Sequence, residues 1–188
     1  MLELIENDVV CNLSDSARQL ETRLYEKFID EDKFASFYSI GYSDKPQFIM
    51  EDGSLKLPKV LGKFAEHFNK IYSQNGDEFV ENQGRKLFLL YLRPIINGVG
   101  NYYVEAETRD RTRTDIIIDY KGKQYVIELK IWHGDEYNSR GEALLSDYLN
   151  YFDLNEGYML SFCFNKNKQS GLLPPVELNG RTLIEAIV

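Results

Sequence analysis

Apolar residues recur every three or four positions in three stretches of the chain, and this spacing predicts three helices. The predicted helices are Ser14–Ile29, Leu57–Tyr72 and Glu78–Ile96. Pro58 suits the first turn of the second helix, and Asn97–Gly100 has the composition of a helix C-terminus. Segments 33–42 and 45–49 are aromatic but too weakly periodic to assign, and Asp52-Gly53 predicts a turn.

The second half of the chain changes to an alternating pattern, which predicts strands. The predicted strands are Tyr102–Thr108, Arg113–Tyr120, Gln124–Ile131 and Tyr158–Phe164. A helix is expected from Asn138 to about Phe152, and Val176–Val188 is expected as a short extended segment, a turn at Asn179-Gly180 and an apolar end. The order helix-strand-strand-strand-helix-strand predicts an α/β domain with a mixed sheet.

A polar, glycine-containing stretch, Ser73–Asp77, separates the two patterns and is the best candidate for a boundary. It divides the chain into a mainly helical N-terminal region, residues 1–76, and an α/β domain, residues 77–188. A chain of 188 residues suits one domain with a smaller attached module.

The net charge of −8 argues against nucleic-acid binding through the whole surface. It leaves room for a local basic groove, because residues 109–130 hold six basic and four acidic side chains. Two cysteines suggest no disulfide framework. We find neither a signal peptide nor an apolar run long enough to span a membrane. These features predict a soluble, cytoplasmic protein without membrane partners.

Two predicted strands around Lys121-Gly122 bring chemically interesting residues together. Glu128 and Lys130 share one face of their strand, because side chains alternate. If Lys121-Gly122 is a two-residue hairpin loop, Asp115 lies directly opposite Glu128, with Cβ atoms about 4.5–5.5 Å apart. A bulged loop would shift this pairing by one residue.

Two opposed carboxylates in an apolar frame repel each other and must be neutralised. One solution is a buried salt bridge between Lys130 and one of the acids. The other is a hard divalent cation, since oxygen ligands suit Mg²⁺ or Mn²⁺. The pattern leaves both solutions open.

The chain also resembles a known family. Asp115 followed by Glu128-Leu129-Lys130 is similar to the D…ExK core of PD-(D/E)XK nucleases. Longer phrases resemble the PD-(D/E)XK domain found at the C-terminus of a bacterial AAA-ATPase-like family: Glu81–Arg85, Pro94–Gly100, Glu105–Arg109, Ile127–Gly134 and Gly157–Leu160. The resemblance covers about residues 78–188, and segment 40–72 resembles the linker that precedes that domain. No Walker A pattern occurs, so the ATPase itself is absent from this sequence.

The resemblance implies a restriction-endonuclease-like core and a set of roles. Asp115, Glu128, the Leu129 carbonyl and Glu81 would hold Mg²⁺ or Mn²⁺. Lys130 would orient the attacking water and stabilise charge at phosphorus. The sequence departs from the pattern once, because Leu144 stands where related nucleases often carry a Gln four residues before a Tyr.

Nucleic-acid contacts are assigned to residues beside this hairpin. Arg109, Arg111 and Arg113 alternate toward Asp115 and suit a row of phosphate contacts, although a solvated hairpin edge explains them equally well. Trp132 and His133 follow the ExK strand and are candidates for DNA contacts; the alternative for His133 is a surface loop position.

The leading hypothesis is therefore a metal-dependent endonuclease or exonuclease that acts on DNA. One rival is a nuclease-fold module that binds nucleic acid or protein without catalysis, which the acidic net charge and Leu144 favour. A second is a protein-interaction domain in which residues 1–76 dock a partner or a second copy of the chain. A separate ATPase is a further candidate partner.

Overall fold

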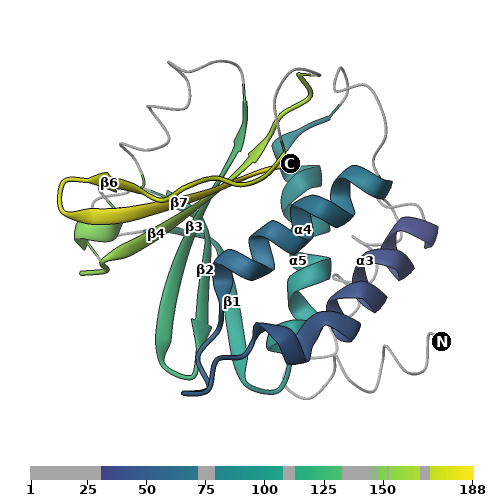
Figure 1. Cartoon of the computed structure of the whole chain (residues 1–188), viewed down its shortest axis with the longest axis horizontal. Coiled ribbons are helices and arrows are strands. Elements are labelled where there is room, and N and C mark those ends of the chain that lie inside the picture. Colours follow the sequence, from purple (N-terminus) through teal and green to yellow (C-terminus); the bar gives the residue numbers. More distant parts are fainter. Residues whose placement is uncertain are drawn as a thin grey trace.

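The computed structural model describes residues 31–71, 79–107, 113–132, 145, 148–151, 153–165 and 170–188. These residues form a mixed α/β fold, as the sequence predicts: a twisted sheet carries helices against one face (Figure 1). The predicted helix at Ser14–Ile29 and the proposed boundary at Ser73–Asp77 lie outside the described residues.

The described residues contribute seven strands to one mixed sheet in the order β1-β2-β3-β4-β7-β5, with β6 also paired to β7. The strands are β1 (Gly100–Glu107), β2 (Arg113–Tyr120), β3 (Lys123–Ile131), β4 (Glu156–Phe162), β5 (Gly171–Leu172), β6 (Val176–Leu178) and β7 (Arg181–Ile187). β1, β2 and β3 are antiparallel neighbours, whereas β3, β4 and β7 run parallel. The predicted turn at Asn179-Gly180 joins β6 to β7, and both of its residues have positive φ.

The β2–β3 hairpin has the predicted register. Tyr120 pairs with Lys123, and the ladder continues to Ile116 opposite Ile127. Lys121 and Gly122 have φ values of 53° and 78°, which is the left-handed geometry of a two-residue hairpin turn. The Asp119 carboxylate accepts a hydrogen bond from the Gly122 N–H at 3.1 Å and supports the turn. The two-residue loop excludes the shift that a bulged loop would have caused.

The described residues include three long helices, α3 (Glu31–Asp44), α4 (Leu57–Ile71) and α5 (Glu81–Ile96), and a 3-10 turn, η1 (Lys45–Phe48), follows α3. Segments 33–42 and 45–49, left unassigned above, thus form α3 and η1. α3 packs along α5, where a Cβ on Gly41 would collide with the Tyr91 carbonyl. Contact with another helix, which local periodicity does not record, is thus a feature of α3. None of the helices in the described ranges is long and apolar enough to cross a membrane.

α5 begins at Glu81, three residues later than predicted. The Gln83 side chain turns back and accepts a hydrogen bond from the Val80 N–H at 3.2 Å, which is half of a capping box. Gly84 then lies against the Phe162 ring of β4, so closely that a Cβ would overlap it. This close approach brings the N-terminus of α5 to the carboxyl end of β4.

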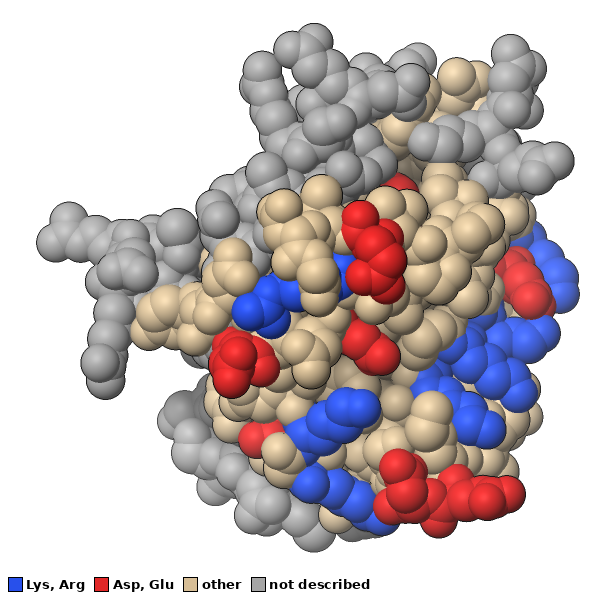
Figure 2. All heavy atoms as spheres, turned by 60° about the vertical axis from the view of Figure 1, so that its left-hand side comes forward, with Lys and Arg blue, Asp and Glu red and all other residues tan. Residues whose placement is uncertain are grey.

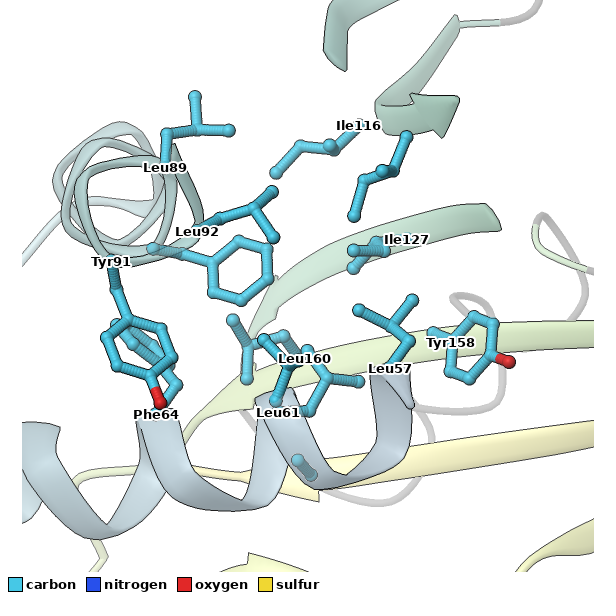
Figure 3. Close-up of a cluster of buried hydrophobic side chains, with 14 of the residues drawn as sticks. Leu57, Leu61, Phe64, Leu89, Tyr91, Leu92, Ile116, Ile127, Tyr158 and Leu160 are labelled. Atoms are coloured by element: carbon cyan, nitrogen blue, oxygen red, sulfur yellow. The ribbon is translucent and has the colours of Figure 1, made fainter. Parts of the chain in front are cut away.

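One hydrophobic cluster fills the space between the helices and the sheet. Figure 3 shows Leu57 and Leu61 of α4 and Leu92 of α5 directed toward side chains of the strands, among them Ile127 and Leu160. Phe64 of α4 lies against the Tyr91 ring of α5. All of these side chains are fully buried. Phe37 of α3 belongs to the same cluster, so the described helices before residue 72 share one core with α5 and the sheet.

The opposite face of the sheet carries a second, smaller cluster. Ile117, Val126, Met159 and Leu183 pack against Leu145, Tyr148 and Leu149, and described residues 145 and 148–151 are helical. These positions fall within the predicted helix 138–152. Asp115, Glu128 and Lys130 lie on this second face, because the residues next to them along β2 and β3 point into the first cluster.

Candidate active site

β2 and β3 separate where the predicted acidic pair stands. The last pair of their ladder is Ile116 with Ile127, one position before Asp115 and Glu128. β3 continues beyond this point because β4 pairs with it from Ile127 to Ile131. The carboxyl end of β3 is therefore covered by β4 on one side and opens toward β2 on the other.

Asp115 occupies the opening between the strands. Its Oδ2 accepts a hydrogen bond from the Leu129 N–H at 2.7 Å. In a strand, the N–H and C=O of one residue point to the same side, so the Leu129 carbonyl also faces β2. The hydrogen bond fixes the Asp115 carboxylate at the backbone of β3.

Glu128 is a buried acid with an unsatisfied oxygen. It is 3% exposed, and its Oε2 has no hydrogen-bond partner among the described residues. Burial first, and then the Asp115 carboxylate, raise the pKa of Glu128 to about 7. Glu128 is therefore an acid that needs a positive charge when it ionises.

Lys130 supplies part of that charge. Its Nζ lies 2.7 Å from Glu128 Oε1, and both side chains are largely buried. Burial lowers the pKa of Lys130, but the hydrogen bond to Glu128 and the surrounding carboxylates outweigh it and raise that pKa above its usual value. Lys130 stays protonated, and its salt bridge with Glu128, one of the two solutions that the sequence left open, is present.

Glu81 approaches the same charges from the first turn of α5. Burial raises its pKa, and so does Asp115, whereas Lys130 and Arg85 oppose the change. A helix thus adds a third acid to the electrostatic environment of the hairpin.

The oxygen atoms at the opening are hard donors that suit Mg²⁺ or Mn²⁺. They are the carboxylates of Asp115 and Glu128 and the carbonyl of Leu129, and the unpartnered Glu128 Oε2 is the atom that a cation would satisfy. Among the described residues, however, no three His, Cys, Asp or Glu side chains form a ready-made metal site. Glu81 interacts electrostatically with Asp115 and Lys130, but among the described residues it does not complete a group of three such ligands.

Three of the five residues predicted to contact nucleic acid lie outside the described residues. They are Arg109, Arg111 and His133, and for Arg113 only the backbone at the start of β2 is described. Trp132 follows β3, and its backbone N–H donates to the Phe162 carbonyl at 2.9 Å. Its ring is half-buried with the indole nitrogen enclosed.

Acidic and basic side chains are interspersed over the face that Figure 2 shows. Basic groups gather along one side of that view, with acidic groups among and below them. This described face therefore lacks the uniform basic character that would bind nucleic acid non-specifically.

Two polar residues on the second face of the sheet were missed at the level of sequence. Ser161 of β4 is 0% exposed and Glu185 of β7 is 8% exposed. Each is the polar member of an alternating series in a strand that otherwise reads as apolar core, at Met159-Leu160-Ser161 and Leu183-Ile184-Glu185. A polar residue at a position where alternation predicts a buried side chain is the feature that could have identified them, because buried polar groups normally have a hydrogen-bond partner.

Tyr148 is buried in the second cluster against residues of the sheet, and Leu144, the departure from the family pattern, lies outside the described residues. Models of known protein families show no match to this chain, and a comparison with curated proteins finds no significant match. The chemistry of the site therefore rests on its own geometry.

Proposed function

We propose that the chain is a metal-dependent nuclease that hydrolyses phosphodiester bonds in DNA, with a restriction-endonuclease-like core of the PD-(D/E)XK type. One observation carries the proposal. A buried carboxylate, Glu128, stands beside a second carboxylate, holds a lysine on one oxygen and leaves the other oxygen unpartnered.

A simple buried salt bridge explains less of this arrangement. Lys130 neutralises one charge, while Asp115 and Glu128 bring two, and Glu81 adds further negative potential. An uncompensated buried charge is costly. A divalent cation at Asp115, Glu128 and the Leu129 carbonyl would remove that imbalance.

The roles of the chain's own residues follow from this placement. When bound, the cation would lower the pKa of a coordinated water and neutralise charge on the phosphate. Asp115 and Glu128 would supply carboxylate oxygens as ligands. The Leu129 N–H keeps the Asp115 carboxylate in place by donating a hydrogen bond to it. Lys130 presents a fixed positive charge where negative charge develops at phosphorus. Glu81 adds negative potential from α5.

Hydrolysis of plasmid and single-stranded DNA tests the proposal. Cleavage should require Mg²⁺ or Mn²⁺ and stop when EDTA is added. Lys130→Ala should lower the rate roughly 100-fold, because a preorganised charge at the reacting phosphate is lost. Lys123→Ala is the matched control, since Lys123 is exposed at the other end of the same strand. Equal rates for wild type and Lys130→Ala, or cleavage that persists in EDTA, would reject the function.

A further inference from the structure

The Ser161 hydroxyl is buried without a hydrogen bond. Its residue is 0% exposed, and Oγ has no partner among the described residues. The backbone is held firmly, because the Ser161 carbonyl accepts a hydrogen bond from the Val188 N–H at 2.9 Å. Burying an unpartnered hydroxyl is unfavourable, and alanine would fill this position without that cost. The presence of serine at this position therefore requires an explanation other than packing.

Lys130 is the cation beside this hydroxyl. Lys130 and Ser161 are direct partners in the parallel ladder of β3 and β4, so their Cα atoms are about 4.8 Å apart and their side chains share a face. The residues that flank Ser161, Leu160 and Phe162, point into the first hydrophobic cluster on the other face. The lysine stem is long enough to bring its ammonium to Glu128 or back to Ser161.

The contact that Lys130 makes in this structure would be weakened by a cation on the other oxygen of the same carboxylate. Its ammonium occupies Glu128 Oε1 at 2.7 Å. A divalent cation on the neighbouring Oε2 would repel that ammonium, because the two positive charges would lie on one carboxylate. Lys130 then needs another acceptor, because an ammonium buried to this degree must keep its hydrogen bonds.

We propose that Ser161 is the positioning residue that accepts the Lys130 ammonium when a divalent cation binds Asp115 and Glu128. The inference rests on the proposed function and deepens it. Ser161 would hold Lys130 on the β4 side of β3, away from the Glu128 carboxylate, and would keep the ammonium beside the site. In the metal-free protein, Lys130 returns to Glu128 and the hydroxyl is left unpartnered.

Kinetics of Ser161→Ala provide the first test. The variant should lose roughly 10-fold in kcat, with KM for DNA unchanged within about twofold, and its metal-free melting temperature should not fall. Ser161→Cys, which keeps a weak acceptor of similar size, should lie between wild type and Ser161→Ala. Thr114→Val is the matched control: it removes another fully buried, unpartnered hydroxyl, on β2, and should leave kcat unchanged.

Spectra of lysine labelled with ¹³C at Cε provide a second readout that does not depend on activity. The Lys130 resonance, identified by its loss in Lys130→Arg, should move when Mg²⁺ is added to the wild type. In Ser161→Ala, its metal-free position should match the wild type, and its Mg²⁺-bound position should differ.

The two failures are distinguishable. If Mg²⁺ moves the resonance identically in wild type and Ser161→Ala, or kcat is unchanged, the role of Ser161 is overturned while the metal site stands. A lower kcat accompanied by a lower melting temperature would show a merely structural role and also overturn it. If Mg²⁺ moves no lysine resonance and DNA stays intact in the wild type, the proposed function fails and the inference with it.

Discussion

Asp115→Asn should abolish DNA hydrolysis and at the same time make the metal-free protein more stable. The substitution removes a charged ligand from the opening between β2 and β3, so the rate should fall by roughly 10³-fold. An asparagine oxygen can still accept the hydrogen bond from the Leu129 N–H that Asp115 Oδ2 accepts at 2.7 Å. The backbone of β3 should therefore keep its position.

Stability should rise because Asp115 raises the pKa of Glu128 through repulsion. Without that repulsion, the free energy of unfolding at pH 8 should increase by about 1 kcal/mol in EDTA. Urea unfolding with and without Mg²⁺ measures the change, and Mg²⁺ should stabilise the wild type but not the variant.

Asp119→Asn is the matched control on the same strand. Asp119 supports the hairpin turn at Gly122 and stands four residues from the opening. The Asp119→Asn substitution should alter neither the rate of DNA hydrolysis nor the stabilisation of the protein by Mg²⁺. An Asp115→Asn protein that is less stable than wild type in EDTA, or one that cleaves DNA at the wild-type rate, would contradict the proposed site.

Metal-free stability should depend on pH through Glu128, in the direction opposite to that of an ordinary salt-bridged acid. Its pKa rises from 4.5 to about 7 on folding, so between these values the folded state holds a proton that the unfolded state has lost. The contribution of Glu128 to the free energy of unfolding is fully present below pH 4.5 and falls as the pH rises to 7. Above pH 7 this contribution does not change further. The full shift corresponds to about 3 kcal/mol.

The contribution of Glu128 is isolated by comparing wild type with Glu128→Gln. In EDTA, the free energy of unfolding of the wild type relative to the variant should fall by up to about 3 kcal/mol between pH 4.5 and 7. Mg²⁺ should offset the fall, because it binds the ionised form. A difference that rises with pH would mean that Lys130 alone neutralises Glu128, and the reason for a cation would disappear.

The hairpin at the centre of the site could be predicted from sequence because each signal is local. β-branched residues such as Ile116, Ile118 and Val126 favour strands, and Lys121-Gly122 provides a two-residue turn. From the turn, alternation alone places Glu128 and Lys130 on one face. The ion pair of 2.7 Å between them follows from that placement.

Features set by tertiary contacts could not be predicted in this way. The ladder ends before Asp115 because its carboxylate, instead of a backbone group, accepts the Leu129 N–H. α3 packs along α5, with Gly41 against the Tyr91 carbonyl. Ser161 becomes conspicuous only when β4 pairs with β3 and puts it beside Lys130. In each case the decisive partner is distant in sequence, and no periodic pattern records it.

The proposed activity requires that Asp115 and Glu128 hold a divalent cation at the opening of the β2–β3 hairpin. Anomalous diffraction from crystals soaked in Mn²⁺ would locate that cation. We expect an anomalous peak within coordination distance, about 2.0–2.3 Å, of Asp115 and Glu128, with Lys130 displaced from Glu128 Oε1. Fully occupied Mn²⁺ elsewhere, with the Lys130–Glu128 ion pair intact and no peak between the two carboxylates, would contradict it.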